Sequence, residues 1–269
     1  MNRIRKIHLI GLFLFLFLGG ISFAQEEGMV EIKKLLEQKS NFTSEQIQTV
    51  LSLLDNANKK DLPVEFLVNR VKEGIARKAN FQAIIKVINQ KIEKLKLADE
   101  LIKDCLNKGI KVKNLDYSRQ VLGELLERGL SADDFKDLSN LAILRKMDLE
   151  ELTKVSQVLV ELIERGIPVE YAKEVVTLAL IKKMDIKRME KTANLFLEAK
   201  IMRVSLEEVK EIIVEGINQR LSIRRIRENI EEVSFTEELR ERIKREEKRE
   251  ISEELRERGW EEREGRESR

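Results

Sequence analysis

A six-residue phrase that recurs at a fixed spacing constrains the fold of this chain more than any other feature. It consists of an apolar residue, a helix-capping residue, a variable residue that is usually apolar, two mostly charged residues and a final apolar or small residue. Between residues 129 and 232 the phrase begins at Leu130, Met147, Ile167, Met184, Val204 and Leu221. Successive phrases start 17 or 20 residues apart, so two steps span 37 residues, the length of a helix-pair repeat.

The phrase has the composition of a helix N-terminus. At its second position, the side chains of Ser131, Asp148, Ser205 and Ser222 can each accept a hydrogen bond from a free backbone N–H in the first helical turn. Asp148 with Glu151, and Ser205 with Glu208, have the spacing of a capping box. Each phrase therefore predicts the start of a helix of roughly 11 to 15 residues, near the average helix length.

Proline and glycine occupy positions that agree with these helix boundaries. Pro168 stands where other phrases have a capping side chain, and its fixed φ suits an early helical position. Gly109, Gly129 and Gly166 fall just before a phrase, where the preceding helix is expected to end in a left-handed conformation. The joints between helices are therefore expected to be short.

The same phrase occurs in the N-terminal half of the chain. Residues 25–40 have the pattern of a short amphipathic helix, and phrases then begin at Phe42, Leu62, Ala79 and Ile110. In the phrase at Ile110, Lys111 takes the capping position, although lysine is a poor cap. The run from Phe81 to Leu106 has helical spacing without an internal stop, which leaves one long helix or two helices as alternatives.

These patterns predict an all-α protein. Charged residues make up 37% of the chain, aromatic residues 5%, and there are two prolines, which argues against a β-rich fold. Helices this short are not stable alone, so each must bury its apolar stripe on its neighbours. We expect tandem helix pairs stacked as an α-solenoid or irregular helical array over residues 25–233, followed by a charged helical unit over residues 234–269.

The first 24 residues have the pattern of a secretory signal peptide. Three basic residues precede an apolar run from Leu9 to Leu18, and Ser22 to Ala24 offers small residues for cleavage near Ala24. The alternative is an uncleaved membrane anchor, but the run is shorter than the roughly 20 residues of a span. The sequence thus predicts export to the periplasm or the extracellular space, with no transmembrane span after cleavage.

Charge and histidine content narrow the function classes. Loss of the leader would leave 48 basic and 49 acidic residues, which gives no electrostatic basis for binding nucleic acid. The one histidine, His8, lies in the leader, so a mature chain would lack histidine-based catalysis and histidine-containing metal sites. No phosphate-binding loop, zinc spacing or calcium loop occurs, and no catalytic residue, cofactor or metal ligand is predicted.

Candidate partner contacts lie toward the C-terminus. The densest basic patch consists of Arg220, Arg224, Arg225 and Arg227. The acidic residues from Glu228 to Glu232 follow within about a turn, so a self-paired solvated face is the favoured interpretation and an anion site the alternative. Trp260, the single tryptophan, is either a partner contact or an incidental residue of a charged tail. Residues 234–269 can be a folded cap on the last repeat or a free tail.

Cysteine and paired acids have simple structural interpretations. Cys105 lies on the apolar face of its helix and is expected in the core, with a reactive thiol or an intermolecular disulfide as the alternatives. Asp133-Asp134 and Glu207-Glu208 fall in predicted first helical turns, where capping and the helix dipole account for them.

In form, the 37-residue helix pairs with glycine at their joints are similar to the tetratricopeptide and Sel1-like class of α-solenoids, although the tetratricopeptide signature residues are absent. The variant phrases from Leu62 to Glu65 and from Ile167 to Glu170 resemble those of exported bacterial repeat proteins. The resemblance implies an array of helix pairs and no activity, so it supplies no site residue.

Two functions fit the sequence. The first is a non-enzymatic scaffold of the bacterial cell envelope that binds a protein or peptide, because stacked helix pairs present an extended surface. A homo-oligomer is compatible with it. The second is an all-helical envelope enzyme that acts on cell-wall glycans through a Glu or Asp acid. A deep acidic cleft with a desolvated carboxyl would favour the enzyme, and a shallow apolar or charged groove would favour the scaffold.

Overall fold

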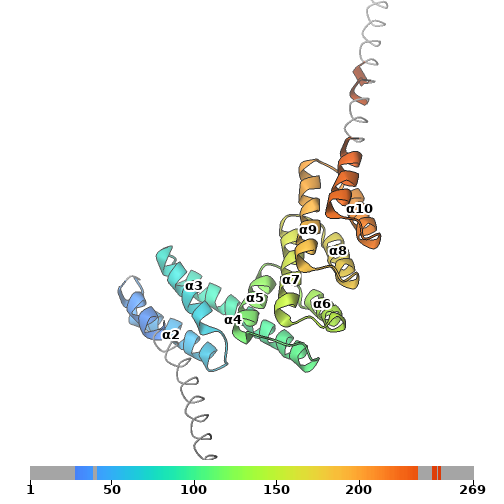
Figure 1. Ribbon diagram of the computed structural model, residues 1–269. Coiled ribbons are helices and arrows are strands. Elements are labelled where there is room, and N and C mark those ends of the chain that lie inside the picture. The colour runs from blue at the N-terminus through green and yellow to red at the C-terminus, as the bar shows by residue number, and fades with distance from the viewer. Residues whose placement is uncertain (1–27, 39–40, 236–243, 247, 250–269) are drawn as a thin grey trace, which may run out of the picture. The chain divides into compact units, whose positions relative to one another are not determined.

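A computed structural model describes residues 28–38, 41–235, 244–246 and 248–249 (Figure 1). The protein is an all-α helical array, as the phrase spacing predicts. Helices cover residues 28–38 and 223–235, and between them lie α2 (Ser44–Asn58), α3 (Val64–Ala76), α4 (Phe81–Asn107), α5 (Leu115–Glu127), α6 (Ala132–Arg145), α7 (Leu149–Glu164), α8 (Val169–Ile181), α9 (Ile186–Ile201) and α10 (Leu206–Asn218).

The chain divides into two compact units within α7, one ending at Ser156 and the other beginning at Gln157. In the first unit, α2, α3 and α4 pack against one another around a core that extends from Ile32 to Leu95. In the second unit, α8 and α9 both pack against α10. Two predictions for the termini, the leader over residues 1–24 and the charged unit over residues 234–269, lie wholly or mostly outside the described residues.

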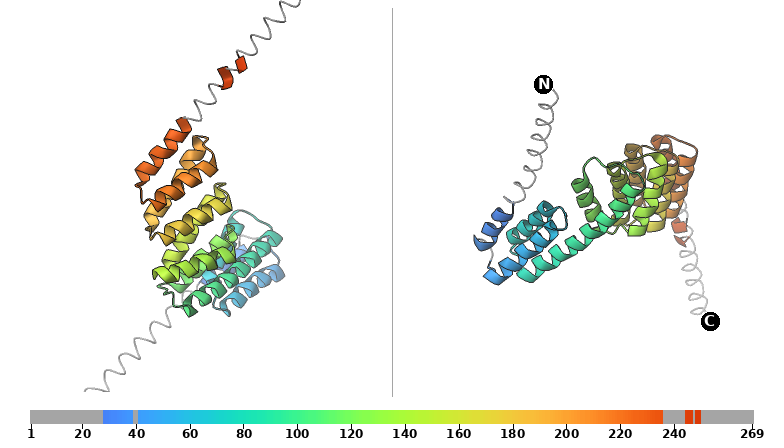
Figure 2. Two further views of the ribbon diagram at one scale, coloured as in Figure 1. Left: turned by 90° about the vertical axis from the view of Figure 1, so that its right-hand side faces the viewer. Right: turned by 90° about the horizontal axis from the view of Figure 1, so that it is seen from below.

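The run from Phe81 to Asn107 is one continuous helix of 27 residues, which decides between the two alternatives left by the sequence (Figure 2). The N-terminal half of α4 packs on α3, where a Cβ on Gly74 would lie 2.8 Å from Ile84. Its C-terminal half packs on α5, where a Cβ on Gly123 would lie 3.0 Å from Leu95. Both glycines permit a close approach between helices, which is why α4 can serve as the common partner of α3 and α5.

Capping side chains hold the helix starts where the phrase predicts them. Asp148 and Glu151 form a capping box at the start of α7, with reciprocal N–H to carboxylate hydrogen bonds of 2.9 and 3.1 Å. Pro63 and Pro168 occupy the N-cap position itself, directly before Val64 and Val169. The second phrase residue accepts a capping hydrogen bond at Thr43, Asn80, Ser131, Asp148, Asp185 and Ser222.

Two expected caps are wrong. Ser205 precedes α10, but its side chain makes no capping hydrogen bond, so the box with Glu208 does not form. The helix expected after Lys111 begins three residues later, at Leu115, because lysine carries no acceptor and Asn114 accepts from the N–H of Tyr117. The intervening backbone is bound by the start of α7: the carbonyl of Lys111 accepts from Leu149 at 2.9 Å.

The joints share one backbone geometry. Gly109, Gly129 and Gly166 have φ of 89°, 106° and 80°, which confirms the left-handed conformation predicted for them. In each case the first residue of the following phrase donates its N–H to a carbonyl five residues earlier, as Leu130 does to Leu125 at 2.9 Å. This is the Schellman hydrogen bond, which satisfies a carbonyl at the end of the preceding helix.

The same geometry occurs at joints without glycine, which the sequence did not indicate. The residue before the phrase has a φ of 53° to 62° at Asp61, Lys78, Lys146, Lys183, Arg203 and Arg220. For an L-residue the left-handed region is unfavourable by about 1 kcal/mol, because Cβ approaches the carbonyl oxygen. Five of these six residues are basic and all six are exposed.

Lys183→Gly is expected to raise the free energy of unfolding by about 0.5–1 kcal/mol, because glycine adopts the left-handed conformation without the Cβ clash. Its neighbour is the control: Lys182 has φ −79°, so Lys182→Gly is expected to lower stability by a similar amount. Urea denaturation of both variants measures the two changes. Equal changes of the same sign would contradict the assigned geometry.

Candidate functional site

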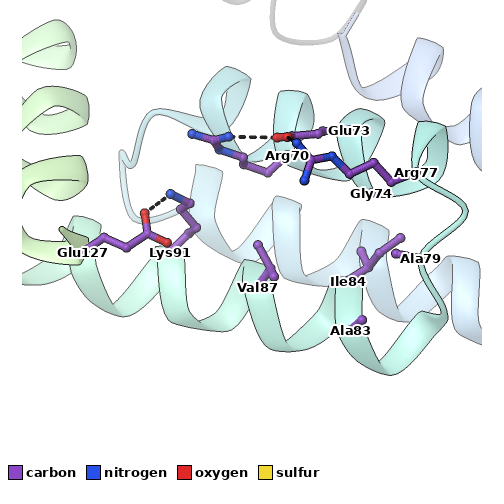
Figure 3. A pocket seen from close by; sticks show the side chains of 10 residues that line it. All are labelled: Arg70, Glu73, Gly74, Arg77, Ala79, Ala83, Ile84, Val87, Lys91 and Glu127. Carbon is purple, nitrogen blue, oxygen red and sulfur yellow. Dashed lines mark hydrogen bonds and ion pairs between the residues drawn. The ribbon is translucent and has the colours of Figure 1, made fainter.

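A cleft of about 290 Å³ lies between α3 and α4 in the first unit (Figure 3). Its floor is apolar, with Ile84 and the half-exposed Val87 on α4. Charged side chains from three helices stand around this floor. The cleft is lined by Arg70, Glu73, Gly74, Arg77, Ala79, Ala83, Ile84, Val87, Lys91 and Glu127.

The charges of this cleft neutralise one another. Glu73 receives ion pairs from Arg70 at 2.8 Å and from Arg77 at 2.6 Å. The hydrogen bond from Arg70, followed by the charge of Arg77, lowers the pKa of the Glu73 carboxyl below its ordinary value. Glu73 is therefore a carboxylate at neutral pH that holds two arginines in place.

Lys91 is the most deeply buried charge of the cleft. Its side chain is almost fully enclosed and its ammonium pairs with the half-exposed Glu127 of α5. The ammonium also lies 5.1 Å from the ring centroid of Phe66, and the guanidinium of Arg70 lies 5.2 Å from the same centroid. These contacts join α3, α4 and α5, so the main role of Lys91 in this geometry is structural.

A larger cavity of about 690 Å³ lies at the joint between α3 and α4. Phe42 and Phe81 meet there edge to face, with ring centroids 5.7 Å apart and planes at 79°. The cavity is lined by Asn41, Phe42, Gln46, Ile75, Lys78, Ala79, Asn80, Phe81 and Gln82.

A third cavity, of about 340 Å³, lies in the second unit where the C-terminal ends of α8 and α10 meet, and we call it the α8–α10 pocket. Among the described residues, no carboxylate lies within 4 Å of the charged groups of Lys182, Lys183 or Arg220. Asp185, the carboxylate that lines the pocket, accepts from the N–H of Arg188 at 2.8 Å as the cap of α9. The pocket is lined by Lys182, Lys183, Met184, Asp185, Arg188, Ile217 and Arg220.

The structure separates the arginines that the sequence grouped together. Arg224 and Arg225 both pair with Glu228, at 2.9 and 3.3 Å, and Arg227 pairs with Glu198 at 2.7 Å. For these three the self-paired interpretation is the one that the geometry favours. Arg220 instead lines the α8–α10 pocket. Trp260 lies outside the described residues.

Sequence reasoning did not find the lysines that join Arg220 in this pocket. Lys183 precedes Arg220 by 37 residues, so the repeat period contained the signal that these positions are equivalent. A basic run also surrounds Lys183, with Lys182, Lys183, Lys187 and Arg188 within seven positions, so the composition carried a second signal. Only the packing of α8 on α10 brings the two joints together.

Two partly buried carboxyls, Asp99 and Glu150, have pKa values below the ordinary range. Burial raises the pKa of Asp99. Hydrogen bonds from Lys103 and Arg119 lower it by a larger amount together, so the net pKa lies below its ordinary value. Burial acts likewise on Glu150, and backbone N–H groups of Asn114 and Lys113 bring its net pKa below the ordinary value. The carboxylates of Asp99 and Glu150 are therefore hydrogen-bond acceptors that connect neighbouring helices and loops.

Cys105 lies in the core of the first unit, as expected. Burial raises the pKa of its thiol to about 11, although a hydrogen bond with Ser139 opposes the shift. The unfolded thiol ionises at a lower pH than the folded one, so this group favours unfolding increasingly as pH rises from about 8.5 toward 11.

Alkylation of Cys105 by iodoacetamide at pH 8 is expected to be at least about two orders of magnitude slower in the native protein than in urea, because few thiols are ionised and the side chain is covered. Mass spectrometry of timed samples gives both rates. Native and unfolded rates that agree within a factor of a few would contradict the burial of this thiol.

Neither a metal site nor a membrane span emerges from the residues described. Within them, no group of three or more His, Cys, Asp or Glu side chains is placed to hold a metal ion. None of the helices in the same residues has both the length and the apolar character needed to cross a bilayer.

Fold and surface together define an all-α array of helix pairs with charged surface clefts. Comparison of the chain with protein-family models, with curated proteins and with solved structures finds no match.

Proposed function

We propose that this protein is an exported, non-enzymatic scaffold of the bacterial cell envelope that binds a protein or peptide partner. The observation that carries the proposal is the α8–α10 pocket, whose cations have no described carboxylate within ion-pair distance. Elsewhere many charged side chains are paired within the fold, as in the α3–α4 cleft. A surface cavity whose cationic side chains are not paired within the fold is suited to binding an oppositely charged molecule.

The carboxyl groups support a binding role over glycan cleavage. A glycosidase needs a general acid whose pKa is raised, so that it is protonated near neutral pH. Here the pKa values of Glu73, Asp99 and Glu150 are lowered by hydrogen bonds and nearby cations. Burial raises the pKa of Asp148, but the hydrogen bond from Lys113 and the backbone N–H of Glu151 together bring the net pKa below its ordinary value. In the α3–α4 cleft, the lowered pKa of Glu73 is the opposite of what acid catalysis requires.

The export part of the proposal rests on the sequence of the first 24 residues. A basic start, an apolar run and a small-residue cleavage site are the features that a signal peptidase pathway recognises. The partner would then be met outside the cytoplasm.

Crosslinking in cells tests the proposal. The full-length protein with a C-terminal tag is expressed in a bacterial host, treated with a membrane-permeant crosslinker and purified for mass spectrometry. We expect a mature N-terminus at Gln25 and specific crosslinked proteins. A version lacking residues 2–24, which stays in the cytoplasm, sets the background. Retention of the leader would contradict export, and an absence of partners above this background would contradict the scaffold.

A further inference from the structure

We propose that the α8–α10 pocket binds an acidic linear segment of the partner protein, in which carboxylates alternate with apolar side chains. This inference rests on the scaffold function and specifies its binding site. It assigns Lys182, Lys183 and Arg220 as the residues that contact the acidic side chains.

The pocket is built from equivalent positions of consecutive repeats. Lys183 and Arg220 each precede a phrase, stand 37 residues apart and adopt the same left-handed conformation, with φ of 58° and 59°. Because α8 and α10 pack together, the two joints line one cavity. One cation from each repeat therefore faces the same space, an arrangement that matches carboxylates spaced along an extended chain.

The charge of the pocket is not neutralised locally. Asp185 is engaged by the N–H of Arg188, and the guanidinium of Arg188 donates to the carbonyl of Leu221 at 2.6 Å. Lys182, Lys183 and Arg220 remain exposed, with no described carboxylate within 4 Å. An acidic ligand can approach them without displacing an internal partner.

Helix-dipole compensation accounts for Lys182 but not for the other two cations. A basic residue in the last turn stabilises the partial negative charge at a helix C-terminus, and Lys182 provides this at φ −79° without backbone strain. Lys183 and Arg220 occupy positions where glycine is more stable, and glycine does occupy that position at Gly129 and Gly166. Left-handed basic residues also occur outside the pocket, at Lys78, Lys146 and Arg203, so the shared cavity and not the backbone conformation distinguishes Lys183 and Arg220.

Apolar surface beside the pocket favours a peptide over a free anion. Met184 and Ile217 line the pocket but are buried in the core, whereas Ile181, at the end of α8 next to Lys182, leaves 57% of its surface exposed. Inorganic phosphate would gain nothing from Ile181, whereas an apolar residue next to the acids of a peptide would bury its exposed surface. Charge and apolar surface together match an acidic, amphipathic segment.

Fluorescence anisotropy tests the inference on the full mature chain. The probe is a labelled peptide of glutamates interspersed with leucines, titrated at low ionic strength, where charge interactions are least screened. The double variant Lys183→Gly/Arg220→Gly is expected to bind it about tenfold more weakly, because two charge-assisted contacts are lost. Both substitutions place glycine in a left-handed position, so weaker binding cannot be attributed to unfolding, and thermal denaturation verifies this.

The matched control is Lys146→Gly/Arg203→Gly, which removes two cations from left-handed joints outside the pocket and is expected to bind as the wild type does. The inference is overturned if both double variants bind equally, or if a peptide with glutamine in place of glutamate binds as well. It is also overturned if Lys183→Gly/Arg220→Gly weakens binding to phosphatidylglycerol vesicles but leaves binding to the peptide unchanged.

Crosslinking in cells separates this inference from the scaffold function. Wild-type protein that captures partners while Lys183→Gly/Arg220→Gly loses them supports both. Equal capture by the two proteins leaves the scaffold in place and rejects this pocket as its site. Wild-type protein that captures nothing rejects the scaffold, whatever the peptide does.

Discussion

Phe196→Ala is expected to lower the free energy of unfolding by about 3–5 kcal/mol. Phe196 lies in α9 with 0% of its surface exposed and is among the largest fully buried side chains. Truncation removes its transfer free energy and leaves a cavity that the packed neighbours fill only in part. Since whole domains are stable by only about 5–15 kcal/mol, this single change removes a large share of the total.

The same helix provides the control for this prediction. Ile201 ends α9 with 83% of its surface exposed, so Ile201→Ala is expected to change stability by less than about 0.5 kcal/mol. Urea denaturation followed by circular dichroism at 222 nm measures both variants. If Phe196→Ala were no more harmful than Ile201→Ala, α9 would not be packed as described.

Gly216→Ala is expected to destabilise the protein by about 1–3 kcal/mol, although alanine is the better helix former by about 1 kcal/mol. A Cβ at this position would lie 2.5 Å from Cγ1 and 2.7 Å from Cδ1 of Ile226, which is itself fully buried. The approach of the two helices at this point therefore leaves no room for a methyl group. The steric term exceeds the propensity term and reverses the sign of the change.

Two further variants isolate the cause. At Gly28 a Cβ would have no other atom within 4 Å, so Gly28→Ala is expected to be neutral or slightly stabilising. Ile226→Ala introduced into the Gly216→Ala protein is expected to cost less than it does in the wild type, because the clash is relieved. Thermal denaturation of the wild type, Gly216→Ala, Ile226→Ala and the combined variant completes a double-mutant cycle. Strictly additive changes in stability would contradict a direct clash.

Local features were predicted well because their causes lie within a few residues. The caps at Ser131, Asp148 and Ser222 depend on an acceptor and an N–H three residues apart. The left-handed glycines depend on the same short range. The local rule marks Lys111 as a poor cap, but it does not include the binding of residues 111–114 by α7, about 37 residues later.

The candidate site could be predicted only in part. Arg220 was identified as a candidate contact because of its basic neighbours. Those neighbours pair with Glu198 and Glu228 and do not line the pocket. Lys182 and Lys183, which complete the pocket, lie far from Arg220 in sequence. Their placement in the pocket follows from the packing of α8 on α10. The repeat period predicts that equivalent helices are neighbours, but it does not predict which side chains meet.

The sequence by itself determined the fold class and most of the places where helices begin, since capping is decided by neighbours within one turn. Tertiary structure alone decided which charges are paired and which are available, as in the burial of Lys91 beside Glu127 and the exposure of Lys183. It also decided that Gly216 is required and not merely tolerated, because the side chain that excludes a methyl group comes from the next helix. Such contacts depend on how helices cross, and no single-helix pattern encodes that.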